Sequence, residues 1–496
     1  MKRNTMRIFA LAGILAFLVG ALVLLEALVW NRLSVQYHCA FVLTDEDGNI
    51  KEESALDSAS FLEGAPMQYL SLGGESSRVA AKNGYGYKFL GWSDGKTSLA
   101  RTDRPFQNEE YTAYFTYDLG ALPFLLFEEG NLTLVSEEGE VLSTYPASVR
   151  KEEVKTGYPA YKYPYRLTFD CARSYYGASS VEWQLLPVSE DPTLLRDLFA
   201  YELSSVLNEN TPTKGNLVLF LEEGKYAGVC LLAPNFLPDS AFAFESGRGE
   251  SIGLETLDAQ VYGAILLSGE QYGLPDHYYK INKSQPYVGN VVIPYLYDCI
   301  FSDGSEELVS AVLDLPSAID CYLLAEYMKN TSAGEKGVLL EYRDGKIYFL
   351  AQTCFTLSAG LDRRTGVEGS LYDISLSTGE EQNEEYGYPQ YILYGLSKLD
   401  WFRSKVGERW RALSASGEIE AALQKAEALS QRAERQLSAD KEKYPFYSVS
   451  NEMRVKEWAY YDGKIKQYTY REHVDALLAW LRERKTVLDE LYREDA

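Results

Sequence analysis

Residues 317–360 constrain the fold most, because they bring a helix end and a strand end together. The apolar run 319–328 predicts a helix, and two short strands follow it, joined across an Arg-Asp-Gly turn. We expect the ends of the helix and of the second strand to face one cleft, lined by Asn330, Ser332, Cys354 and Thr356. A magnesium enzyme would place carboxylates there. This chain offers an amide, a thiol and two hydroxyls instead.

Composition narrows the classes of function. The chain has 496 residues, enough for two or three domains. Its formal net charge of −24 argues against nucleic acid as a partner, because no basic stripe is available to neutralise phosphates. Only three histidines are present, so a Ser-His-Asp site or a histidine zinc site is poorly supplied. The six cysteines are widely and irregularly spaced, which favours buried thiols over a disulfide framework.

The N-terminus predicts a membrane anchor. Lys2, Arg3 and Arg7 precede an apolar run over residues 8–30 that only Glu26 interrupts. A basic flank before an apolar span predicts a cytoplasmic N-terminus and an extracytoplasmic bulk, hence a single-pass protein of a bacterial cell membrane. A cleaved signal peptide is the alternative, although the run is long for one and lacks a clear cleavage site.

The rest of the chain predicts an α+β protein. After the anchor at residues 1–36, residues 37–117 read as short strands with turns, and residues 118–156 as further strands leading into the next domain. The main domain covers residues 157–496 and ends in helices. Asp191 is expected to cap a helix there, with Pro192 at the first helical position. Thr469 and Glu472 form a capping box.

One stretch of the first β-rich part resembles a surface module. Residues 87–95 (YKFLGWSDG), with Arg101-Thr-Asp and Tyr114-Phe115, resemble the InlB B-repeat-like module of bacterial surface proteins. The resemblance covers about one module and implies a spacer or adhesion domain with a β-grasp-like fold. From the residues alone, Phe89 and Trp92 are expected to pack in the core of a small sheet rather than to bind a ligand.

The main domain resembles the CotH kinase family, first known from spore coats. The matching segments occur in order from about residue 157 to residue 491: 164–170 (PYRLTFD), 191–203 (DPTLLRDLFAYEL), 224–232 (GKYAGVCLL), 322–330 (YLLAEYMKN), 342–346 (YRDGK), 355–360 (FTLSAG) and 477–484 (LLAWLRER). The resemblance implies a divergent two-lobed protein-kinase-like fold, with a small β-rich lobe, a larger helical lobe and Mg-ATP between them.

The chain departs from the family at each acidic position. Members carry Asn-x-Asp after the helix, where this chain has Asn330 and Ser332, the degenerate catalytic position. They carry Asp-Phe-Asp at the strand end, where Cys354 and Thr356 occupy the two metal positions. Ala233-Pro234 replaces an acidic residue after a third motif, and a proline there is expected to break backbone pairing. A thiol and hydroxyls are poor magnesium ligands, so the sequence assigns no metal ligand and no cofactor. ATP and Mg²⁺ follow only if the family activity is retained.

Some basic groups of the family pattern persist. Arg166 lies in the first family strand, Arg196 on the first helix, and Lys280 near a family basic position. The resemblance implies that they contact nucleotide phosphates. The alternative from the residues alone is that they are solvated or ion-paired surface charges.

Three functions remain open from the sequence. The leading hypothesis is a membrane-anchored, extracytoplasmic pseudokinase that binds or scaffolds cell-surface or coat proteins. The second is an active atypical kinase that phosphorylates such proteins, with carboxylates recruited from residues 235–290 or from Glu326, and with Asp320 and Glu341 also nearby in sequence. The third is a surface adhesin or wall-binding protein whose β-module does the work.

Overall fold

The chain divides into two compact units, Met1–Leu119 and Gly120–Ala496, and each unit builds its own β-sheets. The computed structural model describes residues 19–21, 34–44, 50–62, 70–72, 87–98, 101–103, 109–117, 121–152, 162–189, 191–208, 213–235, 241–248, 265–267, 277–281, 287–330, 338–353, 355–361, 366–374, 391–444 and 469–493.

The first unit contains a four-stranded and a two-stranded sheet. The larger sheet has the order β2-β1-β6-β4, and the smaller pairs β3 with β5. Their bounds are β1 Ser34–Thr44, β2 Ile50–Leu62, β3 Leu70–Leu72, β4 Tyr87–Trp92, β5 Arg101–Asp103 and β6 Glu109–Tyr117. Strand β6 runs parallel to β1 and antiparallel to β4. Phe89 contacts Trp92 and Phe115 edge to face, with ring centroids 5.4 and 5.5 Å apart, so both expected aromatics pack together.

The expected transmembrane anchor over residues 1–36 has to be corrected. Within the part of the chain that the structure describes, no helix combines the length and the apolar character that a membrane span needs. Of the apolar run, the structure describes only the helical turn at residues 19–21. The remainder of the run lies outside the described residues. The expected single-pass membrane localisation is therefore not retained.

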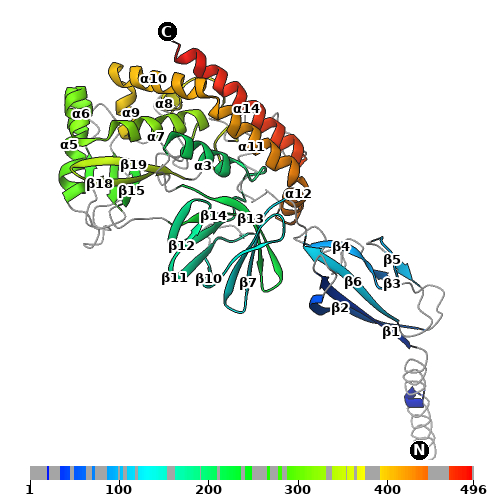
Figure 1. Ribbon diagram of the computed structural model, residues 1–496. Coiled ribbons are helices and arrows are strands. Elements are labelled where there is room, and N and C mark those ends of the chain that lie inside the picture. The colour runs from blue at the N-terminus through cyan, green and yellow to red at the C-terminus, as the bar shows by residue number, and fades with distance from the viewer. Residues whose placement is uncertain are drawn as a thin grey trace, which may run out of the picture. The chain divides into compact units, whose positions relative to one another are not determined.

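The second unit opens with an eight-stranded sheet that curls on itself (Figure 1). The strand order is β10-β11-β12-β14-β13-β7-β8-β9, with β7 Phe124–Glu128, β8 Asn131–Val135, β9 Val141–Pro146, β10 Ser148–Lys151, β11 Tyr165–Tyr175, β12 Ala178–Leu186, β13 Asn216–Glu222 and β14 Lys225–Pro234. Strands β9 and β10 form opposite edges, yet only Ala147 separates them. The two edges must therefore approach each other. Residues 121–152, expected as a lead-in, supply four of these strands.

Alternation along the strands divides the sheet into two faces. Val218 and Phe220 of β13 point into the curl, where they pack with Trp183, Leu185 and eight further apolar side chains of the same cluster, besides the thiol of Cys230. Leu217 of the same strand points the other way and joins the core shared with the helices. Both faces of the central strands are thus buried, which explains their almost unbroken apolar sequence.

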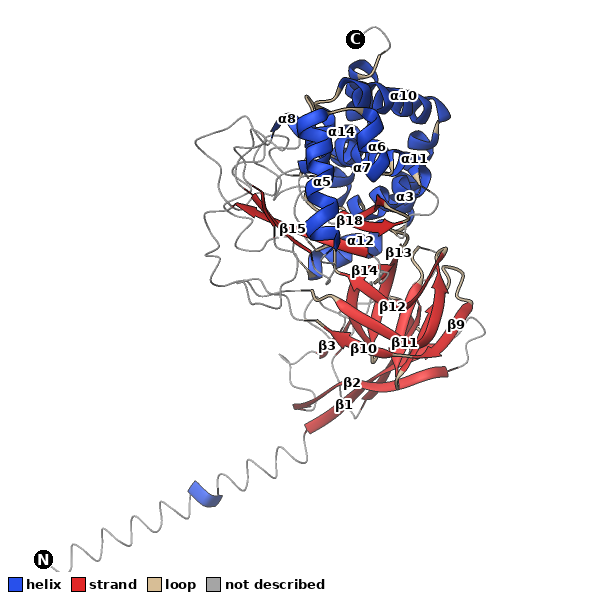
Figure 2. Ribbon diagram, turned by 90° about the vertical axis from the view of Figure 1, so that its left-hand side faces the viewer, coloured by secondary structure: helices blue, strands red, loops and turns tan. Residues whose placement is uncertain are grey.

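A five-stranded sheet and a group of helices complete the second unit. The sheet has the order β16-β17-β15-β18-β19, with β15 Ala241–Arg248, β16 Ile265–Leu267, β17 His277–Ile281, β18 Val338–Arg343 and β19 Lys346–Gln352. The helices are α3 Arg196–Leu207, α5 Ile293–Tyr297, α6 Glu306–Val312, α7 Leu315–Met328, α8 Leu371–Ile374, α9 Tyr391–Ser397, α10 Asp400–Ser416, α11 Glu418–Arg432, α12 Glu434–Lys443 and α14 Tyr470–Leu491. Two π-helical turns, Val288–Val292 and Asp298–Asp303, flank α5. Figure 2 shows most helices gathered on one side and the strands of the curled sheet on the other, with α12 next to β14.

Buried contacts join the curled sheet to the helices. The Lys162 ammonium lies 2.8 Å from the Asp440 carboxylate of α12, and both side chains are almost fully buried. The other carboxylate oxygen of Asp440 accepts hydrogen bonds from the Tyr226 hydroxyl and the Val229 amide, both at 2.7 Å. This carboxylate therefore has its charge paired and its lone pairs occupied, as a buried ion requires.

Several local expectations agree with the elements observed. The apolar run 319–328 lies in α7, and the hairpin across Asp344-Gly345 is β18–β19. The capping box of Thr469 and Glu472 opens α14. Cys230, Cys299 and Cys321 are buried thiols, whereas Cys171 is exposed. As a fold class, the structure is α+β, with a curled sheet and a helical C-terminal part. The expected class was wrong in including a membrane helix.

Candidate functional site

The end of helix α7 meets the segment that follows strand β19. Helix α7 ends at Lys329, which adopts a left-handed backbone with φ of 47°. The backbone N–H of Asn330 donates to the Ala325 carbonyl at 3.0 Å, and the backbone N–H of Ala359 donates to the Met328 carbonyl at 2.7 Å. These bonds satisfy carbonyls that a helix end leaves without partners, and they hold residues 355–361 against α7.

Asn330 is turned into the protein. Its side chain is 1% exposed, and the amide nitrogen donates to the Thr353 carbonyl at 3.3 Å and approaches the Gln352 side-chain oxygen at 3.5 Å. Asn330 therefore connects the end of α7 to the end of β19. Ser332 and Cys354, the other two residues expected around this cleft, lie outside the described residues.

Thr356, which the resemblance predicts at a metal position, is hydrogen-bonded to a carboxylate from another element. Its hydroxyl donates to Asp197 of α3 at 3.0 Å, and the Phe355 amide donates to the other oxygen of Asp197 at 2.9 Å. Asp197 is 3% exposed, and this burial raises the pKa of its carboxyl to about 6, against the two hydrogen bonds, which lower it. The first turn of α3 thus clamps the strand-end segment.

Arg196 reinforces the same clamp and is completely buried. Its guanidinium pairs with Asp191 at 2.5 Å and donates to the backbone carbonyls of Ser358 and Ala359 at 3.0 and 3.3 Å. The Asp191 carboxylate also accepts the amides of Thr193, Leu195 and Arg196 at 2.8–2.9 Å. Asp191 therefore caps the turn before α3, while the helix itself begins at Arg196 rather than at Pro192.

The other basic residues expected at the cleft lie elsewhere. Arg166 lies on β11 and pairs with Glu152 at 2.8 Å and with Glu182 at 3.4 Å, with its side chain 36% exposed. Lys280 lies on β17, opposite Glu245 in the ladder, and its side chain is outside the described set. The structure brings Asn330, Thr356 and Arg196 to one region, and it places Arg166 and Lys280 on two different sheets.

Pro234 does not interrupt strand pairing as expected. It is the last residue of β14 and lies opposite Trp183 in the ladder with β12. A proline at a strand end removes a donor that the ladder no longer needs there. Ala233, beside it, is 2% exposed.

The nearby carboxylates that could have replaced the family aspartates have other partners. Glu326 is completely buried, lies 2.6 Å from the Arg484 guanidinium of α14, and accepts the Leu371 amide and the Ser370 hydroxyl. Asp320 pairs with Arg409 at 2.8 Å. Glu341 pairs with Arg343 at 3.2 Å. Among the described residues, no group of three or more His, Cys, Asp or Glu side chains is arranged to hold a metal ion.

Sequence reasoning missed Asp197 as a site residue. It stands next to Arg196 in a matching segment, but its partners Phe355 and Thr356 are more than 150 residues away. The available signal was an acidic residue in the first turn of an expected helix, which by itself predicts only a favourable interaction with the helix dipole.

Comparison with known proteins gives only weak structural likeness. No family model matches the chain, and no curated protein matches it either, so membership of the CotH family stays a prediction. Among solved structures, the chain is similar to the Golgi casein kinase, at 8% sequence identity and a TM-score of 0.21, covering 76% of this chain and 74% of that one. A likeness this weak carries no argument about the fold or the site.

Proposed function

We propose that this chain is a kinase-like binding protein. In it, the residues at the family's catalytic cleft hold helices α3 and α7 and the segment after β19 together instead of binding magnesium and nucleotide. The observation that supports this most is the clamp of Asp197 on Phe355 and Thr356. At a position where the family holds magnesium, a hydroxyl donates to a buried carboxyl. The backbone of the same segment also accepts hydrogen bonds from Arg196 and donates one to the end of α7.

Electrostatics support the same proposal. Phosphoryl transfer needs carboxylates that are ionised and able to share their charge with a metal ion. Burial raises the pKa of Asp197, so the protein favours its neutral form more than water does. Glu326, which the sequence suggested as a replacement carboxylate, is paired with Arg484. A protein built in this way would act by binding a partner, and we propose a protein partner.

The test is an assay of phosphoryl transfer with the full chain. Purified protein is incubated with radiolabelled ATP and either magnesium or manganese, alone and with casein as a general acceptor. We expect no incorporation above that of heat-denatured protein. Incorporation that depends on the metal and disappears in Asp197→Asn would overturn the proposal.

A second candidate function follows from the same contact. Asp197 approaches Thr356 to 3.0 Å, so a carboxylate from α3 lies beside a family metal position. An active kinase could use this carboxylate in place of the missing aspartates. In that case manganese with ATP should raise the melting temperature of the wild-type chain by more than that of Asp197→Asn, because a ligand bound to the native state stabilises it. Equal shifts in the two proteins would rule this candidate out.

A further inference from the structure

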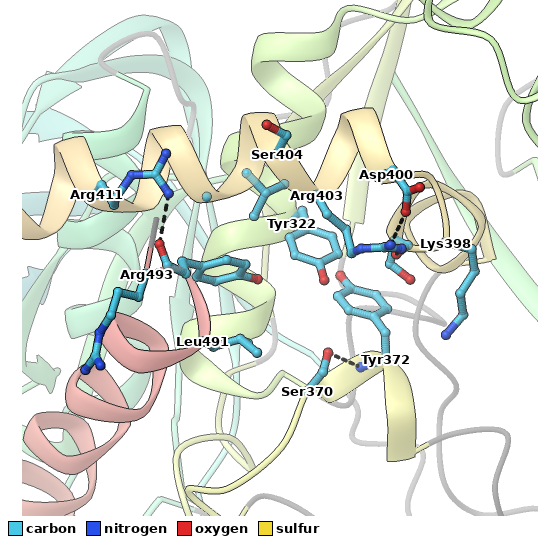
Figure 3. A pocket seen from close by; sticks show the side chains of 14 residues that line it. Tyr322, Ser370, Tyr372, Lys398, Asp400, Arg403, Ser404, Arg411, Leu491 and Arg493 are labelled. Atoms are coloured by element: carbon cyan, nitrogen blue, oxygen red, sulfur yellow. Dashed lines mark hydrogen bonds and ion pairs between the residues drawn. The ribbon is translucent and has the colours of Figure 1, made fainter. Parts of the chain in front are cut away.

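A pocket with a volume of about 520 Å³ lies among the helices of the second unit (Figure 3). It is enclosed by α7, α10, the segment that enters α8 and the C-terminal end of α14. Its volume lies within the range of about 300–1,000 Å³ that is usual for small-molecule sites. None of the residues discussed above for the kinase cleft, except Ser370 beside Glu326, lines it.

The lining has the opposite charge balance to the chain. Four cationic side chains line the pocket: Lys398, Arg403, Arg411 and Arg493. Asp400 is the single acidic residue in the lining. The whole chain carries 72 acidic and 48 basic residues. A local excess of positive charge on an acidic protein attracts anions, and walls of low dielectric strengthen the attraction.

Two of these arginines are oriented by contacts within the pocket wall. Arg403 pairs with Asp400 and donates to the Ser397 carbonyl at 3.0 Å, while Arg411 donates to the Tyr492 carbonyl at 2.9 Å. Both come from α10, and Arg493 follows α14 (Figure 3). A guanidinium carries five N–H donors in a fixed fork, so Arg403, with its contacts to Asp400 and Ser397, can also offer a donor to an oxyanion.

A buried hydroxyl in the same wall has no partner among the described residues. The Tyr372 side chain is 1% exposed, lines the pocket, and its hydroxyl oxygen makes no hydrogen bond. Its ring stacks on Tyr322, with centroids 4.5 Å apart and planes inclined by 12°. Figure 3 shows the two tyrosines side by side near Arg403. A buried hydroxyl without a partner is unfavourable, so the wall is better matched to a ligand that brings an acceptor.

We propose that this pocket binds a small phosphorylated molecule, a phosphomonoester whose organic part is flat or apolar. A phosphate dianion has enough oxygen acceptors for the arginine forks and for the Tyr372 hydroxyl together. Burial raises the pKa of the Tyr372 hydroxyl, which keeps it protonated and able to donate. Val406, Leu491 and the Tyr492 ring, which also line the pocket, provide an apolar surface for the rest of the ligand.

The probe for this proposal is phenyl phosphate, titrated into the full chain by calorimetry in the presence of a metal chelator. We expect saturable binding below about 5 mM ligand, weakened by added sodium chloride as an ionic contact should be. Inorganic phosphate should bind more weakly, because it lacks the ring. Benzoate should not compete, because it lacks the dianionic phosphate. The titration extends to roughly 10 mM phenyl phosphate, so it detects even a weak millimolar Kd. If no binding is seen in that range, the proposal is overturned.

Two variants locate the site. Arg403→Gln removes a half-exposed guanidinium and should lower the affinity about tenfold or more, in line with the loss of a charge-assisted contact. Tyr372→Phe removes only the hydroxyl and should lower it about three- to tenfold without lowering the melting temperature.

The matched control is Arg482→Gln. It removes an arginine of similar exposure that pairs with Glu427 away from the pocket lining, and it should leave the affinity unchanged. Equal affinity in all three variants would show that phenyl phosphate binds elsewhere and would overturn the proposal. Asp197→Asn should not affect this binding, so failure here and failure of the proposed function are distinguishable.

Discussion

Two buried titratable residues, Asp197 and His473, shift their pKa values in opposite directions. Burial raises the pKa of Asp197 from 3.8 to about 6. Burial, assisted by the charges of Lys441 and Arg196, lowers the pKa of His473 from 6.5 to about 3. Between about pH 4 and pH 6, folded Asp197 holds a proton that the unfolded chain has lost, while folded His473 lacks one that the unfolded chain holds. Their contributions to the pH dependence of stability therefore cancel in this window.

Single substitutions should expose each contribution. In Asp197→Asn, the free energy of unfolding should rise with pH between 4 and 6 more steeply than in the wild type, by up to about 1.4 kcal/mol per pH unit. In His473→Gln, the free energy of unfolding should fall with rising pH over the same range, relative to the wild type, with a slope of similar size. The measurement is urea denaturation at pH 4.5, 5.0, 5.5 and 6.0. Curves parallel to the wild type in both variants would contradict these protonation states.

Gly360 is required for steric reasons as well as for its backbone angle. Its φ is +82°, and a Cβ atom there would lie 2.6 Å from the Trp480 ring. Gly360→Ala should therefore cost more than the roughly 1–2 kcal/mol of a left-handed residue alone, because the buried indole must also move. Gly369→Ala is the matched control, with φ of +68° and open space around the Cβ position. Thermal unfolding should rank the Gly360 variant as clearly the less stable, and similar losses would refute the steric argument.

At the scale of elements, one buried ion pair fastens helix α14 to helix α7. Arg484 and Glu326 are both completely buried and lie 2.6 Å apart. The same guanidinium donates to the carbonyls of Val367 and Gly369 at 2.5 and 2.8 Å. The pair thus joins two helices and the segment that leads to α8. A buried pair of this kind is costly to break, because one charge stays behind without its counter-ion.

Replacement of Arg484 should destabilise the second unit strongly. We expect Arg484→Met to lower the free energy of unfolding by about 3–5 kcal/mol, since Glu326 would remain buried. Arg482 lies two residues away on α14, and its 45%-exposed side chain pairs with Glu427. Arg482→Met should therefore lower the free energy of unfolding by about 1 kcal/mol or less. Chemical denaturation of both variants tests this. A loss below about 1 kcal/mol for Arg484→Met would contradict the assigned role.

The whole molecule consists of two units with separate sheets. Within the described residues, strands β1–β6 pair only among themselves, and the eight-stranded and five-stranded sheets draw all their strands from the second unit. Each unit also has its own aromatic or apolar core, around Trp92 in the first and around Trp183 in the second. The second unit should therefore fold without the first.

Expression of residues 120–496 alone tests this expectation. The fragment should keep a cooperative thermal transition within about 3 °C of the corresponding transition of the full chain, because its core is complete. It should also keep the phenyl phosphate affinity. A fragment that lacks a cooperative transition would show that the two units depend on each other for stability.

The sequence by itself determined the local elements. Helix α7, the β18–β19 hairpin and the capping box of α14 follow from apolar spacing, an Asp-Gly turn and the Thr469–Glu472 pair, all of which act within a few residues. The wide and irregular spacing of the cysteines also predicted buried thiols, and three of the four cysteines that the structure describes are buried. The prediction of a membrane span from the N-terminal apolar run and its basic flank was wrong, because no described helix is long and apolar enough for one.

Only the tertiary structure decided what the cleft residues do. Arg196 was expected to contact phosphates, and packing instead buries it against Asp191 and residues 358–359. The bond from Thr356 to Asp197 joins positions 159 residues apart, and the pocket lining extends from Tyr322 to Arg493. Such contacts depend on how helices and sheets pack, and the local pattern of a sequence carries little information about partners that far away. Tertiary packing also decided the curl of the eight-stranded sheet, because only pairing shows that β9 and β10 lie at opposite edges.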